Sequence, residues 1–134
     1  MTNSLTLAYW CVLIAALLPI VCAGIAKWGA MGKSAKEGGY DNDDPRAWLA
    51  QQTSWRARAN AAQANSFEAL PFFIGAVIIA HQMGANQGWV NALAASFIVL
   101  RLVYIALYVG GRGNLRSLVW ALALGVNISL LFVG

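Results

Sequence analysis

The chain has 134 residues, of which 60% are hydrophobic and only 10% are charged. Because soluble domains carry about 25% charged residues, this composition excludes a soluble class and predicts one integral membrane domain over residues 1–134. The net charge of +4 comes without a basic helix interleaved with aromatic residues. We therefore expect no nucleic-acid partner and interpret the charge as a signal of membrane topology.

Four apolar segments predict four membrane-spanning helices. They occupy residues 5–28, 54–83, 89–109 and 115–133. A bilayer core of about 30 Å needs roughly 20 helical residues, and each segment is about that long or longer. The sequence therefore predicts an all-α integral membrane protein built as a four-transmembrane-helix bundle. Cys11 and Cys22 are too far apart on the first helix to form a disulfide, so we expect free thiols.

The connections carry capping signals. Residues 29–54 form the one long connector, which is rich in glycine and charge. Within it, Asp44 followed by Pro45 predicts a short helix with an aspartate cap and a proline in the first helical position. Asn114 is expected to cap the last helix by accepting a hydrogen bond from the backbone N–H of Arg116 or Ser117.

Basic residues indicate the orientation. All lysines and arginines except Arg101 flank or fill the first and third connections. The positive-inside rule therefore places these loops in the cytoplasm and both termini outside. His81 lies near the outer end of the second span without a second metal ligand, so we interpret it as an interfacial polar residue and predict no metal site.

Two charged residues, Glu68 and Arg101, lie inside the predicted spans. An ionisable group in the membrane is costly unless it is paired or faces a wet cavity. Their predicted depths differ by about 6 Å, so we expect the two side chains to pair. The pair could form a functional polar site, or it could be a salt bridge that only fixes helix packing.

Each of these charges belongs to a polar stripe on its helix. Arg58, Asn65 and Glu68 follow one another at i, i+7 and i+10 on the second span. Arg101, Tyr104 and Tyr108 follow at i, i+3 and i+7 on the third. The tyrosines could also belong to an aromatic belt at the membrane boundary.

Arg116 and Ser117 open the fourth span. A helix N-terminus favours an anion, and a nearby cation lowers the pKa of a thiol. The pair could therefore stabilise a thiolate, or Arg116 could set topology while Ser117 caps the helix. No P-loop, GxSxG or metal-ligand spacing occurs, so enzymatic options narrow to chemistry on a thiol or a lipid.

Three segments together resemble the MAPEG family, membrane-associated proteins in eicosanoid and glutathione metabolism. These are RANAAQANSFEALPFF, LRLVYIALYVGGR in the third span and LRSLVW at the start of the fourth. The resemblance covers essentially the whole chain and is nearest to short bacterial members. It implies a homotrimer in the bacterial cytoplasmic (inner) membrane, with glutathione bound between subunits near the cytoplasmic side. A hydrophobic small-molecule substrate would enter from the membrane lipids.

The resemblance also implies roles for individual residues. Asn65 and Glu68 match the N-x-x-E motif of the family, and Arg116 with Ser117 matches an Arg-Ser pair implicated in thiol activation. By resemblance, the catalytic residues are Arg116, Ser117 and Tyr108, and the glutathione-binding residues are Lys27, Arg58, Asn65, Glu68, Arg101 and Tyr104.

Several positions depart from the family pattern, among them Pro71, which follows Glu68 by three positions where eukaryotic members often have four. Ala61 and Ala64 stand where many members have arginines, and Gln63 stands where a histidine is frequent. Each missing arginine–carboxylate contact is worth about 1.5–3 kcal/mol, so we expect weakened glutathione binding.

Our leading hypothesis is a membrane-bound glutathione (or related thiol) transferase or peroxidase that acts on hydrophobic electrophiles or lipid hydroperoxides. The alternative is a non-catalytic lipid-binding or scaffolding protein of the same fold. A proton-coupled exporter that uses Glu68 is less favoured, because Arg101 would neutralise that carboxylate.

Overall fold

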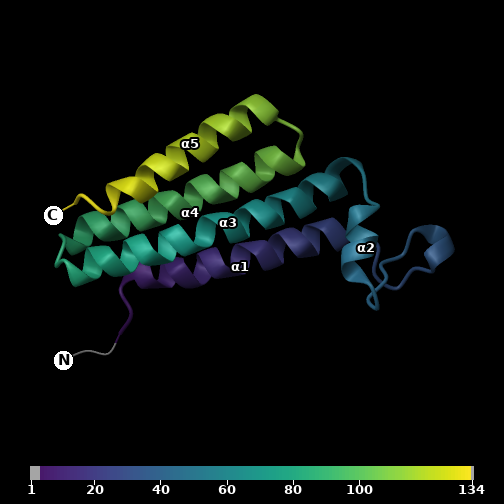
Figure 1. The fold of residues 1–134 in the computed structure, drawn as a ribbon, viewed down its shortest axis with the longest axis horizontal. Coiled ribbons are helices and arrows are strands. Elements are labelled where there is room, and N and C mark those ends of the chain that lie inside the picture. Colours follow the sequence, from purple (N-terminus) through teal and green to yellow (C-terminus); the bar gives the residue numbers. More distant parts are fainter. Residues whose placement is uncertain (1–3, 134) are drawn as a thin grey trace.

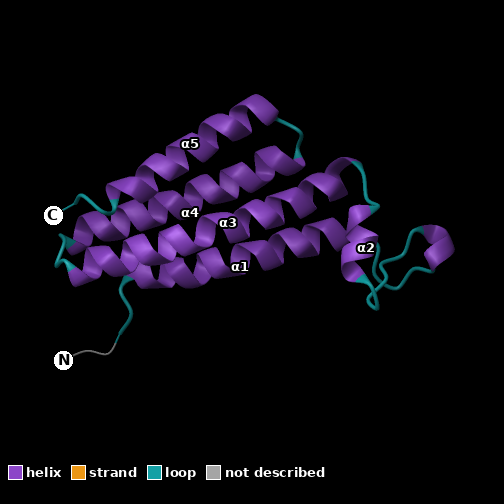
Figure 2. Cartoon of the chain, viewed as in Figure 1, coloured by secondary structure: helices purple, strands orange, loops and turns teal. Residues whose placement is uncertain are grey.

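The computed structural model describes residues 4–133, in which long helices pack side by side (Figure 1). Apart from the connecting turns and loops, this part of the chain is helical, and it contains no strands (Figure 2). In chain order the elements are α1 (Leu7–Lys27), the 3-10 turn η1 (Ala35–Glu37), α2 (Pro45–Ala50), α3 (Ser54–Gln82), α4 (Gln87–Val109) and α5 (Gly113–Ser129). The predicted all-helical class is confirmed.

Three of the long helices are suited to crossing a membrane. Of the residues described, α1, α3 and α4 form helices that are both long and apolar enough to span a bilayer. Helix α5 has 17 residues. Its length is therefore about 25 Å, below the roughly 30 Å of a bilayer core. The fourth membrane span accordingly stays a prediction.

The long helices alternate in direction, so the two ends of the bundle differ (Figure 1). One end carries the connector between α1 and α3 together with the turn between α4 and α5, and we call it the loop end. The other end carries the start of α1, the end of α5 and the turn between α3 and α4. The start of the first long helix and the end of the last thus lie at the same end, as predicted, and the cytoplasmic placement of the loop end stays a prediction.

One of the two predicted caps is confirmed. Asp44 accepts a hydrogen bond from the Ala47 backbone N–H at 3.4 Å, and Pro45 opens α2. The predicted Asn114 cap is wrong, because α5 already begins at Gly113. The Arg116 N–H donates to the Arg112 carbonyl at 2.9 Å, so Asn114 lies inside the helix rather than before it.

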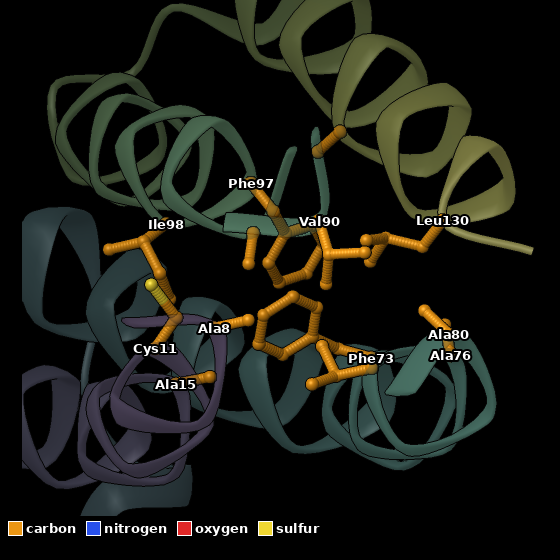
Figure 3. Packing of buried hydrophobic residues seen from close by; sticks show 13 residues of the cluster. Ala8, Cys11, Ala15, Phe73, Ala76, Ala80, Val90, Phe97, Ile98 and Leu130 are labelled. Carbon is orange, nitrogen blue, oxygen red and sulfur yellow. The ribbon is translucent and has the colours of Figure 1, made fainter. Parts of the chain in front are cut away.

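The core combines one aromatic pair with small side chains. Phe73 of α3 and Phe97 of α4 stack with ring centroids 4.2 Å apart (Figure 3). Small residues pack around them on α1 and α3, including Ala8, Ala15 and Ala76. Small residues allow helix backbones to approach closely in a membrane, where the hydrophobic effect does not drive helices together. Cys11 and Cys22 are buried free thiols, as predicted.

His81 ties the helices together at the terminal end. Its Nδ1 lies 2.7 Å from the Val77 carbonyl oxygen, which can only accept, so Nδ1 carries the proton. Nε2 then accepts from the Thr6 hydroxyl at 2.7 Å, and the imidazole stacks on Tyr9 with ring centroids 3.9 Å apart. These contacts give His81 a packing role between α1 and α3.

The close packing of the helices can be tested at Ala62, which is fully buried in a cluster with Leu18 and Tyr104. We expect Ala62→Leu to lower the free energy of unfolding by about 1–3 kcal/mol, because the added atoms have no space. Thermal unfolding in detergent, followed by tryptophan fluorescence, measures the change. Ala92→Leu on the exposed side of α4 is the control and should unfold like the parent. Equal stability of both variants would contradict the packing.

Candidate functional site

Arg101 is the buried charge of the bundle. It lies on α4 and is 2% exposed. Its Nη2 donates to Asn65 Oδ1 on α3 at 2.7 Å, and its guanidinium lies 4.2 Å from the centre of the Tyr104 ring. The amide oxygen and the aromatic face offset part of the cost of removing a guanidinium from water.

The predicted pairing of Arg101 with Glu68 is wrong for the single chain. Arg101 binds Asn65 instead, and Glu68 is exposed on the surface of α3. Helices α3 and α4 are antiparallel neighbours, and Asn65 lies about one turn nearer the loop end than Glu68. The amide of Asn65 therefore lies at the level of Arg101 along the bundle, whereas the carboxylate of Glu68 lies about one turn beyond it.

Glu68 and Arg101 nevertheless share a cavity, which we call the mid-span pocket. It has a volume of about 170 Å³. One side is polar, and the other carries aromatic and aliphatic side chains from three helices. Its lining residues are Asn65, Glu68, Ala69, Phe72, Phe97, Arg101, Trp120, Ala123 and Leu124. A cation, an amide and a carboxylate beside an apolar wall suit a molecule with a polar and a lipophilic part.

A second cavity lies at the loop end, and we call it the arginine pocket. It has a volume of about 150 Å³ and contains three arginines, Arg58, Arg112 and Arg116. Arg58 Nε donates to the Val109 carbonyl at 3.0 Å, which holds this α3 side chain against the end of α4. The remaining lining residues are Leu107, Tyr108, Gly111 and Gly113.

A column of two aromatic rings with a guanidinium at each end connects the two pockets. Arg101 lies over Tyr104, whose ring meets Tyr108 edge to face with centroids 5.7 Å apart. The guanidinium of Arg116 lies 4.2 Å from the centre of the Tyr108 ring. The side chains of the predicted α4 stripe therefore contact one another in a row, and Arg116 of α5 extends this row.

Two predicted site residues lie apart from the others. Lys27 is the last residue of α1, and its Nζ lies 4.5 Å from the centre of the Tyr40 ring in the connector. It lines neither pocket. Ser117 is exposed and also lines neither pocket. The other predicted residues are grouped around the two pockets or between them: Arg58, Asn65, Glu68, Arg101, Tyr104, Tyr108 and Arg116.

The structure adds residues to both pockets that the sequence did not suggest. The sequence analysis used Arg112 only as a signal of topology. Arg112 and Arg58 line the same pocket, but they lie on different elements and far apart in the sequence, so the sequence did not reveal that they are neighbours. Trp120 lies one turn after Arg116 on α5, and this helical spacing was the available signal for its place near the site.

These features define a multi-pass helical membrane protein with a cavity among its helices that has both polar and apolar lining residues. The sequence profile of the MAPEG family matches residues 7–134, essentially the whole chain. The chain therefore belongs to the MAPEG family, whose members are membrane proteins of glutathione and eicosanoid metabolism. Comparisons with curated proteins and with solved structures gave no match.

The contact between Asn65 and Arg101 predicts a loss of stability when the amide is removed. Asn65→Ala leaves a buried guanidinium without its acceptor, so we expect unfolding to become easier by about 1–3 kcal/mol. Asn65→Asp keeps an acceptor and should retain stability. Thermal unfolding in detergent distinguishes the variants. Gln63→Ala, two residues away and outside both pockets, is the control. The assigned contact is incorrect if Asn65→Ala and Gln63→Ala unfold alike.

Proposed function

We propose that this protein is a membrane-bound glutathione (or related thiol) transferase or peroxidase acting on hydrophobic electrophiles or lipid hydroperoxides. The observation that carries the proposal is the mid-span pocket. It combines the Arg101 guanidinium, the Asn65 amide and the Glu68 carboxylate with an aromatic wall among membrane helices. A hydrophilic thiol and a lipophilic partner can meet only where both kinds of surface adjoin.

The polar groups match the chemistry of glutathione. A guanidinium and an amide N–H bind a carboxylate or a peptide carbonyl, and a carboxylate binds an ammonium group. In the proposed site, Arg101, Asn65 and Glu68 therefore orient the tripeptide, and Tyr104 holds Arg101 in place. Arg58 supplies further positive charge at the loop end. Lys27, which lies outside both pockets of its own chain, contributes to the site of a neighbouring copy.

The proposed reaction needs a thiolate. Arg116, with Ser117 beside it, stabilises the sulfur anion, and Tyr108 contacts it. In conjugation, the thiol proton is lost to solvent, the sulfur bonds to the electrophilic carbon and a halide or similar group leaves. In peroxide reduction, two thiols reduce a lipid hydroperoxide to an alcohol and water and are themselves oxidised to a disulfide.

We also propose a homotrimer in the bacterial inner membrane, with the loop end in the cytoplasm. Support for assembly comes from Glu68, which is exposed on the surface of an apolar helix in the single chain. A carboxylate that faces lipid costs several kcal/mol, and a neighbouring copy would cover it. Support for the orientation comes from the concentration of basic side chains at the loop end.

The second candidate is a non-catalytic lipid-binding or scaffolding protein. Ala61 and Ala64 favour it, because arginines at these positions would bind the carboxylates of glutathione. The mid-span pocket of about 170 Å³ is also smaller than the roughly 300–1,000 Å³ of typical ligand pockets. The two candidates agree on the fold and differ in whether a thiol reacts.

One experiment separates these candidates. The protein is purified in detergent, and glutathione binding is measured together with turnover of 1-chloro-2,4-dinitrobenzene and of a lipid hydroperoxide. Binding with turnover of either substrate supports the enzyme. A trimer that neither binds glutathione nor turns over either substrate excludes the enzyme and leaves the lipid-binding role.

The role of Arg116 predicts a pH effect. Arg116→Leu removes the cation beside the thiolate, so the pKa of the bound thiol rises toward the free value of about 8.5. We expect conjugation at pH 7 to fall about 10-fold, and the difference to shrink as pH rises and more thiol ionises. The pH dependence of kcat between pH 6 and 9.5 measures this shift. Lys33→Leu, in the exposed connector, is the control. A uniform loss at all pH values would contradict thiolate stabilisation.

A further inference from the structure

The arginine pocket gathers positive charge without a negative partner. Three arginines line a cavity of about 150 Å³, one on α3, one at the N-cap of α5 and one in the first turn of that helix. None of its lining residues is acidic. The acidic residues of the chain are Glu68, which lines the mid-span pocket, and four residues of the connector, Glu37, Asp41, Asp43 and Asp44.

Such a group of cations repels itself, and other contacts hold two of the three side chains in place. Arg58 is tied to the Val109 carbonyl, and Arg116 is stacked on Tyr108. The Arg58 guanidinium also lies close to Gly111, where a Cβ would come within 3.6 Å of its central carbon. Gly111 has φ of +77°, a backbone conformation that favours glycine, so this turn is held in contact with the arginine.

The start of α5 adds to the positive potential. No side chain caps this helix, whose N-cap residue is Arg112 itself. The first N–H groups of a helix have no partner within the helix and carry the positive end of its dipole. Gly113, the first residue of α5, lines the same cavity, so the start of the helix lies beside the arginines.

The shape and position of the cluster favour a phosphate. If the guanidinium groups of three arginines reach one anion, each can donate to a separate oxygen of a tetrahedral phosphate, whereas a carboxylate offers only two. The pocket also lies where α4 ends and α5 begins, at the predicted membrane boundary where lipid phosphates are found. Leu107 and Tyr108 form its apolar side.

We propose that the arginine pocket binds a phosphate group at the membrane boundary, held by Arg58, Arg112 and Arg116. The phosphate belongs either to an anionic phospholipid headgroup or to a soluble phosphate. Phosphate binding at this site is separate from the proposed thiol reaction, and it can be measured without any thiol. Because Arg116 serves both, a bound phosphate would draw positive charge away from a thiolate.

The test uses Arg112, which has no part in the proposed thiol site. Purified protein in a non-ionic detergent is titrated with dioctanoyl phosphatidylglycerol, with inorganic phosphate and with dioctanoylglycerol, which lacks phosphate. We expect saturable binding of phosphatidylglycerol at one site per chain. Arg112→Gln should weaken it about fivefold, the effect of one boundary arginine on an anionic lipid. Arg112→Lys should restore part of the affinity. Arg46→Gln, in the exposed first turn of α2, is the matched control and should bind like the parent.

The probes distinguish the sources of the phosphate. Tighter binding of phosphatidylglycerol than of inorganic phosphate assigns the site to lipid, and the reverse order assigns it to a soluble phosphate. The proposal is overturned if neither phosphate probe binds, if dioctanoylglycerol binds as well as phosphatidylglycerol, or if Arg112→Gln binds like Arg46→Gln. Binding should also weaken as salt rises, because the contact is electrostatic.

Discussion

The hydrogen bond between Arg101 and Asn65 is the contact on which the arrangement of the site depends. A guanidinium that is 2% exposed among apolar helices must find an acceptor, and in the single chain Asn65 supplies it. Because the acceptor is on α3 and the donor on α4, the contact fixes how these antiparallel helices are aligned along their length. That alignment also brings Phe73 against Phe97 and places Glu68 beside the mid-span pocket without bonding to Arg101.

Beyond this contact, the arginines of the site are held by stacking on aromatic rings rather than by ion pairs. Arg101, Tyr104, Tyr108 and Arg116 form a column in which each cation faces a ring and the two rings meet edge to face. A cation over a ring contributes roughly 0.5–2 kcal/mol depending on desolvation, so each contact is modest. Their common effect is geometric. The column places one arginine in the lining of each of the two cavities.

The sequence was sufficient to predict where the long helices lie, but not which side chains on different helices contact one another. Long apolar segments predict α1, α3 and α4 because burying backbone groups in lipid permits little else. Helical spacing likewise predicted that Arg101, Tyr104 and Tyr108 share a face. The partner of Arg101 was missed because the choice between Asn65 and Glu68 depends on alignment to within one helical turn. The start of α5 was missed for a similar reason, since Gly113 and Asn114 resemble a turn but continue into the helix. Contacts between elements distant in sequence, such as Arg58 with the turn at Gly111, left no periodic signal.

The two alanines on α3 have a consequence for where the charge of the site lies. Ala64 is exposed and Ala61 is half-buried, on the side of α3 that also carries Glu68. Arginines there would add guanidinium groups at membrane depth, each costing about 2.5–3.5 kcal/mol at the centre of a bilayer. Without them, one arginine lines the mid-span pocket and three line the arginine pocket. Positive charge is thus concentrated at the loop end of the bundle, and the exposed surface around Glu68 carries no further cation from these two positions.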